Sequence, residues 1–257
     1  MRRTGLSFLI VLLVCGLFFF LPTVLCAQNA REIINHYLDT VSGGNIANWG
    51  KIKTVYIEAE TFYSQEEFDR TQPTLSAKVV KYTKTFQEFP DKLKIETYED
   101  STYTRFSSAT LWLAKENKLI LLFNNMAPII KEFDDEPGDL HPVYISKLVK
   151  KSKALNYKGI KNFDTAGSSC FDVEVVSKDV KIDLYFNVKS YLLEYSKIFN
   201  EDGTENYVRY YDYREVDGLL FYFSYHAMRD GRIFHFERIK RIHINPSIEP
   251  GTFQFAK

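Results

Sequence analysis

The sequence predicts a mainly β protein in which long antiparallel strands curve into a half-open barrel. Phe, Trp and Tyr make up 16% of the chain, and aromatic and β-branched residues favour strands. After residue 50, apolar and polar residues alternate over most of the chain, which is the period of a strand with two different faces. Asp-Gly turns separate the last runs, and such short connections require antiparallel neighbours.

The first residues are typical of an exported protein. Arg2 and Arg3 precede an uncharged run over residues 5–25, and Leu25-Cys26-Ala27 offers a cleavage site. We therefore expect residues 1–27 to be a signal peptide and residues 28–257 to form a single domain in the periplasm. Two alternatives stay open, because the run is nearly long enough to remain as a membrane anchor and Cys26 is a candidate for lipidation.

An amphipathic helix is expected at the start of the mature domain. Gly43-Gly44 ends it by supplying left-handed backbone geometry. A helix of this length is not stable alone, so its apolar stripe must pack against a larger apolar surface. The stripe recurs at the spacing of one helix face and consists of Ala30, Ile33, Ile34, Tyr37, Leu38 and Val41.

Strand-like runs follow the helix in two groups. The segment 124–139 between the groups is irregular, and a second helix is expected from Pro142 to about Lys151, because proline suits the first helical position. We expect about eleven strands in total, with the two helices forming a lid. The strand-like runs from which these strands are expected to form are 55–63, 75–86, 93–97, 102–107, 110–115 and 118–123, then 155–163, 170–177, 180–187, 191–199, 206–216, 219–228 and 231–244.

Patterns that indicate catalysis or metal binding are weak, so we expect no enzyme, no cofactor and no metal. None of the five histidines has metal-ligand spacing. The acidic residues of 132–139 fit no calcium loop and favour a solvated loop. Cys170 is the one cysteine beyond the leader, and its apolar neighbours favour a buried thiol over a nucleophile. The formal net charge of zero gives no electrostatic argument for nucleic acid.

The second helix carries a basic face. Lys147, Lys150 and Lys151 lie at i, i+3 and i+4. The pattern fits an ordinary solvated surface, and it also fits a docking patch for anionic lipid headgroups or an acidic envelope protein.

Several segments, in this order and spacing, resemble the outer-membrane lipoprotein carrier (Lol-type) family and its lipoprotein-sorting relatives. They are Ile52-Lys53-Thr54 after the helix, Phe89-Pro90-Asp91-Lys92-Leu93-Lys94-Ile95, Thr110-Leu111-Trp112-Leu113, Tyr185-Phe186-Asn187 and Asp212-Tyr213-Arg214. The resemblance implies a curved antiparallel sheet closed by helices, with a cavity that holds lipoprotein acyl chains. In the carrier, a basic residue before the strand's proline helps to hold the lid shut. Phe89 stands at that position here, so the lid mechanism is not carried over.

We therefore expect a monomeric, non-enzymatic envelope protein that binds lipid or lipoprotein acyl chains in a hydrophobic cavity. The alternative is an envelope sensor or protein-interaction module of the same fold without lipid cargo. The residues expected to face inward and line the cavity are Val55, Ile57, Val79, Leu93, Ile95, Leu111, Leu113, Phe186, Phe221 and Phe223.

Overall fold

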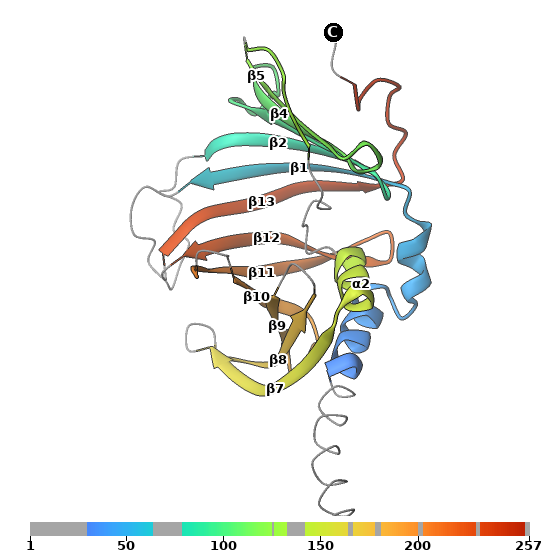
Figure 1. Cartoon of the computed structure of the whole chain (residues 1–257), viewed down its shortest axis with the longest axis vertical. Helices are drawn as coiled ribbons and strands as arrows, with labels where there is room; N and C mark the ends of the chain where they lie inside the picture. Colours follow the sequence, from blue (N-terminus) through green and yellow to red (C-terminus); the bar gives the residue numbers. More distant parts are fainter. Residues whose placement is uncertain are drawn as a thin grey trace, which may run out of the picture.

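The computed structural model shows one curved, open antiparallel sheet (Figure 1). In the part of the chain that the structure describes, the sheet has thirteen strands in the order β6-β5-β4-β3-β2-β1-β13-β12-β11-β10-β9-β8-β7. Because β6 and β7 stand at opposite ends of this order, the sheet does not close into a barrel. The described residues are 30–63, 79–124, 126–132, 142–163, 167–177, 181–199, 203–229 and 232–254.

The sheet consists of two meanders that meet along β1 and β13, so strands from the two ends of the domain lie side by side. The first meander comprises β1 (Thr54–Tyr63), β2 (Val79–Glu88), β3 (Lys92–Tyr98), β4 (Phe106–Leu113), β5 (Lys118–Phe123) and β6 (Ile129–Glu132). The second comprises β7 (Ala154–Phe163), β8 (Ser168–Val176), β9 (Lys181–Asn187), β10 (Leu193–Phe199), β11 (Glu205–Val216), β12 (Leu219–Arg229) and β13 (Arg232–Ile244).

The predicted fold class is confirmed, although the described part of the sheet has thirteen strands where about eleven were expected. Two details of the strand prediction are wrong. The segment expected to be irregular contains the short strand β6, and the runs 102–107 and 110–115 contribute to one strand, β4, instead of two. Asp100 explains the second difference. Its carboxylate accepts hydrogen bonds from the backbone N–H groups of Thr102, Thr104 and Arg105, at 3.0, 3.1 and 2.6 Å. These bonds fold the chain into a turn where a strand was expected.

Both predicted helices are present, at residues 30–41 and in α2 (Pro142–Lys151). Two short 3₁₀ helices, η1 (Ile46–Lys51) and η2 (Ala114–Glu116), are also present. The leader expected at residues 1–27, with Cys26, lies outside the described residues.

The hydrophobic core lies where the helices pack on the sheet. In Figure 1 both helices stand beside the β7–β11 part of the arc. Ile34 and Tyr37 of the N-terminal helix and Ile145 of α2 are almost fully buried. The ring of Tyr37 lies 5.2 Å from that of Phe186, between ring centroids. The apolar stripe predicted for the first helix is therefore buried against the second meander, as its length required.

The end of the N-terminal helix is joined closely to the turn between β11 and β12. Gly43 has φ +64°, and a Cβ atom there would lie 2.6 Å from the carbonyl oxygen of Gly218. Asp217 and Gly218 both have positive φ, as the predicted Asp-Gly turn requires. Glycine at position 43 therefore satisfies both the backbone conformation and the close approach.

The side chains of the first meander divide between two faces, because successive residues of a strand point to opposite sides. Val55 and Ala59 belong to the same buried cluster as the helices, so we call their side of the sheet the helix face. Tyr56, Glu58 and the residues in register with them lie on the opposite side, which we call the outer face.

Candidate functional site

The helix face of β3, β4 and β5 carries two rows of mainly apolar side chains. In the first row, Ile95 of β3 pairs with Thr110 of β4 and with Thr85 of β2. Thr85 in turn pairs with Ile57 of β1, so this row lies on the helix face. The first row continues to Leu121, and the second row contains Leu93, Trp112 and Leu119.

These rows are less well buried than the core. Leu93 is buried, whereas Ile95, Trp112, Leu119 and Leu121 are each half-buried. Among the described residues, no side chain of β2–β6 belongs to the buried cluster that contains the helices. The helices therefore pack mainly against the second meander and β1, and the first meander keeps an apolar surface that is partly accessible.

Trp112 adds a polar feature to this surface. Its indole Nε1 is buried and has no hydrogen-bond partner among the described residues. A buried donor without an acceptor is costly.

Four of the residues expected to line a cavity are core residues instead. Val55, Phe186, Phe221 and Phe223 are all buried in the cluster that contains the helices. The ring of Phe221 lies 5.1 Å from that of Trp49 in η1. The chain's own side chains thus fill the space around them, and a ligand has little access to these positions.

The remaining predicted positions are divided between the two faces. Ile57, Leu93 and Ile95 share the helix face. The inward placement is wrong for Leu111 and Leu113, because pairing aligns them with Lys94 and Lys92 on the outer face. Thr110-Leu111-Trp112-Leu113 is apolar on both faces, so alternation alone did not show which residues point toward the helices.

Two predicted side chains, those of Val79 and Lys147, lie outside the description, although their backbones belong to β2 and α2. Lys150 and Lys151 are exposed in the last turn of α2. The basic face proposed for this helix is therefore on the surface at these two positions.

Sequence reasoning missed Trp112, Leu119 and Leu121 as candidate ligand contacts. The run 118–123 was identified as a strand, but the order of the strands is needed to place it beside β4. The available signal was the apolar content of this run, with four apolar residues between Lys118 and Phe123.

On β1 and β3, the outer face carries polar side chains that are paired with one another. The hydroxyl groups of Tyr56 and Tyr98 donate to the carboxylates of Glu58 and Glu96, each at 2.7 Å. Burial and these neighbouring carboxylates raise the pKa of both phenols above the ordinary value, so the tyrosines remain neutral donors. These polar pairs are confined to part of the outer face, because on β4 and β5 the same face carries Leu111, Leu113 and Ile120.

The described residues offer little for catalysis or metal chemistry. They contain no group of three or more His, Cys, Asp or Glu side chains placed to hold a metal ion. Cys170 is fully buried, and burial with the nearby Glu194 raises the pKa of its thiol to about 12. The predicted buried thiol is confirmed. Within the described ranges, the helices are too short or too polar to cross a bilayer.

The sequence matches no protein-family model and no curated protein, but solved structures share the fold. A LolA superfamily protein from Nitrosomonas europaea aligns with a TM-score of 0.55 and 10% identity, over 85% of this chain and 94% of the other. A DUF1329 family protein from Desulfovibrio piger aligns with a TM-score of 0.59 and 9% identity, over 89% and 97%.

A third structure is described as a domain of an outer membrane lipoprotein-sorting protein from Vibrio parahaemolyticus. It aligns with a TM-score of 0.56 and 11% identity, over 89% of this chain and 97% of the other. The fold expected from the sequence resemblance is therefore confirmed: the described chain has the fold of the LolA superfamily and lipoprotein-sorting structures.

Proposed function

We propose that this protein is a non-enzymatic envelope protein that binds the acyl chains of a lipid or lipoprotein on the helix face of β3–β5. The observation that carries the proposal is the half-buried apolar surface of Ile95, Trp112, Leu119 and Leu121, which lies outside the helix-packed core. Burial of an acyl chain there is favourable by about 0.8 kcal/mol for each CH₂ group removed from water.

The fold and the lone donor of Trp112 support the same function. The V. parahaemolyticus structure is described as part of a lipoprotein-sorting protein, and the present chain shares its fold. Acyl chains in lipids and lipoproteins are joined through ester or amide carbonyls. Such a carbonyl is a suitable acceptor for the buried indole N–H.

A matched pair of variants on β5 tests the proposal. Leu121 lies on the helix face and Ile120 on the outer face, and both are half-buried. Leu121→Asp places a charge on the proposed acyl surface, so we expect it to weaken binding of a fluorescent fatty acid at least about tenfold. Ile120→Asp introduces the same charge on the other face and should leave binding nearly unchanged.

Native mass spectrometry of the protein after incubation with a bacterial lipid extract identifies the bound species. Unfolding curves of both variants establish that each is folded at the assay temperature. Equal fatty-acid binding by the two variants, or wild-type protein that is repeatedly recovered without lipid, would contradict an acyl site on the helix face.

The expected cellular location is part of this proposal. We propose that residues 1–27 direct export and that residues 28–257 act as one monomeric domain in the periplasm. There the domain would have access to the membranes that contain its acyl cargo. Lys150 and Lys151 would then contact anionic headgroups. The Lys150→Glu/Lys151→Glu double variant should reduce co-sedimentation with vesicles containing phosphatidylglycerol, and unchanged sedimentation would remove the docking role.

The alternative function, a protein-interaction module without lipid cargo, is favoured by one feature of the sheet edge. Phe123, Met126, Ile129 and Ile130 are large apolar residues in or beside β5 and β6, and each is at least 40% exposed. An edge strand with exposed apolar side chains is suited to pairing with a strand from another protein. Cross-linking in envelope fractions would favour this function if it captured a stoichiometric protein partner on lipid-free protein.

A further inference from the structure

The C-terminal segment 245–254 crosses the outer face of the first meander as a strap. Asn245 turns the chain away from β13 with φ +54°, and its side-chain Oδ1 accepts a hydrogen bond from the backbone N–H of Lys53 at 2.7 Å. The hydroxyl of Thr54 donates to the carbonyl of Pro246 at 2.8 Å. At the far end, the ammonium of Lys92 lies 5.3 Å from the ring centroid of Phe253. The strap is therefore held at both ends.

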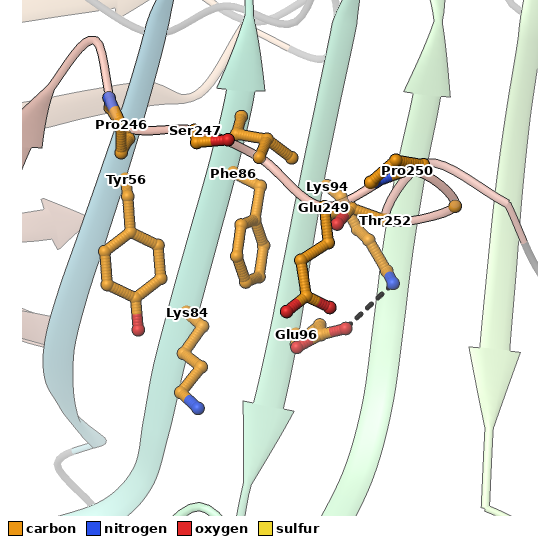
Figure 2. Close-up of a pocket in the computed structure, with 12 residues that line it drawn as sticks. Tyr56, Lys84, Phe86, Lys94, Glu96, Pro246, Ser247, Glu249, Pro250 and Thr252 are labelled. Carbon is orange, nitrogen blue, oxygen red and sulfur yellow. Dashed lines mark ion pairs between the residues drawn. The ribbon is translucent and has the colours of Figure 1, made fainter.

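A cavity of about 670 Å³ lies between this strap and the strands, a size within the usual range of small-molecule sites. Its floor consists of outer-face side chains from β1, β2 and β3, and Figure 2 shows the strap passing across these strands. The rings of Tyr56 and Phe86 form the apolar part of the floor, with centroids 5.1 Å apart. The lining also includes Lys84, Lys94, Glu96 and the strap residues 246–252.

Most polar groups of the floor already have partners. The Lys94 ammonium lies 2.8 Å from Glu96 Oε1, and the Tyr98 hydroxyl donates to Glu96 Oε2. The Tyr56 hydroxyl donates to Glu58. Because these groups are paired with one another, they are less available to bind a ligand than an unpaired charged group.

Two lining residues of opposite charge, Lys84 and Glu249, belong to none of these pairs. The Lys84 ammonium lies 4.4 Å from the ring centroid of Tyr103 and 5.4 Å from that of Tyr98. These cation–π contacts orient the charge without neutralising it. Lys84 lies in register between Glu58 of β1 and Glu96 of β3, but among the described residues these carboxylates form their ion pairs with Arg241 and Lys94, and neither Lys84 nor Glu249 forms one. Figure 2 shows Glu249 extending from the strap toward the strands, and Lys84 on the same strand as Phe86.

We propose that this cavity binds a zwitterionic small molecule with an apolar or aromatic body, of amino-acid to dipeptide size. Its carboxylate would meet Lys84, its ammonium would meet Glu249, and its body would lie on the rings of Phe86 and Tyr56. The site is on the outer face, whereas the proposed acyl surface is on the helix face of the same sheet, so each can be tested without the other.

Three probes with one aromatic body separate the two charges. Phenylalanine carries both charges, phenylpropionate carries only the carboxylate, and phenylalaninamide carries only the ammonium. We expect phenylalanine to bind saturably in isothermal titration and more tightly than either analogue. Loss of one charge-assisted contact at a partly exposed site should weaken binding about tenfold.

Variants assign each charge to its residue. Lys84→Gln should weaken phenylalanine and phenylpropionate but not phenylalaninamide, and Glu249→Gln should weaken phenylalanine and phenylalaninamide but not phenylpropionate. Lys81→Gln is the matched control, because Lys81 lies on the same strand but on the helix face, opposite Thr61. It should bind all three probes as the wild type does.

The proposal is overturned if no probe binds saturably, or if Lys84→Gln and Glu249→Gln leave the order of affinities unchanged. It is also overturned if Lys81→Gln weakens binding as much as Lys84→Gln. Fatty-acid binding measured on the same variants shows separately whether the acyl site is intact, so failure of one site is distinguishable from failure of the other.

Discussion

At the scale of single residues, burial sets the protonation behaviour of several side chains. His226 packs beside Tyr211, with ring centroids 5.7 Å apart. Its burial, together with the positive charge of Arg209, lowers its pKa to about 4. Burial also lowers the pKa of His235. Both histidines are therefore neutral in the folded protein at neutral pH.

The lowered pKa of His226 predicts a loss of stability in mild acid. An unfolded histidine takes up a proton below about pH 6.5, whereas folded His226 does so only near pH 4. The unfolded state binds more protons between these values, so the free energy of unfolding falls as pH decreases from about 6.5 to 4. His226→Gln should reduce this fall, as measured by urea denaturation at several pH values.

His235 should keep part of the slope in the His226→Gln variant, because burial lowers its pKa as well. An identical pH dependence in wild type and His226→Gln would show that burial of this ring does not couple folding to protonation.

At the scale of elements, local sequence signals located both helices and most strands. The stripe from Ala30 to Val41 and the Pro142 start gave helices in the expected places. Local signals failed where interactions other than the alternation of apolar and polar residues determined the backbone conformation. The Asp100 carboxylate accepts hydrogen bonds from three backbone N–H groups and thereby stabilises a turn. Strand β6 forms by pairing with the edge of β5. Neither event is visible in the alternation of apolar residues.

The close contact between the N-terminal helix and the β11–β12 turn predicts that alanine substitutions at two adjacent glycines lower the free energy of unfolding by different amounts. Gly43 and Gly44 both have positive φ, but a Cβ atom meets the carbonyl of Gly218 only at position 43. Gly44→Ala should destabilise the protein by about 1 kcal/mol through backbone strain. Gly43→Ala should cost at least about 1 kcal/mol more, because the helix end must move from the turn.

Urea denaturation of the two variants measures this difference directly. The single variants share the strain of an alanine at positive φ, so their difference isolates the contact with Gly218. Equal free energies of unfolding would mean that the helix end is not held against the turn.

At the scale of the whole molecule, the two halves of the sheet have different roles. The second meander and the helices form the buried core, whereas the first meander carries a half-buried helix face and an outer face crossed by the strap. This division supports an arrangement in which one half stabilises the fold and the other half is available for binding. Stability and ligand binding should then depend on different residues.

A pair of alanine substitutions tests this division. Phe186→Ala removes a fully buried ring that packs on Tyr37, and we expect a loss of about 3–5 kcal/mol in the free energy of unfolding. Leu119→Ala truncates a half-buried side chain on the proposed acyl surface and should cost about 1 kcal/mol. Comparable losses in chemical denaturation would show that β5 belongs to the folding core after all.

The candidate site could be predicted only in part. Ile57, Leu93 and Ile95 were identified as helix-face residues from alternation within their own strands. Leu111 and Leu113 were assigned to the wrong face, and Trp112, between them, was overlooked. In a segment that is apolar on both sides, alternation separates two sets of residues but does not say which set faces the helices.

The sequence by itself determined the properties that depend on neighbouring residues along the chain: the periods of helix and strand, the place of the Asp217-Gly218 turn and the burial of Cys170. The tertiary structure alone decided which face each strand presents, where the helices stop covering the sheet, and how segment 245–254 encloses a cavity on the outer face. The physical reason is that these features depend on the register of strands far apart in the chain. Val55 lies opposite Ile244, and no local pattern records that pairing.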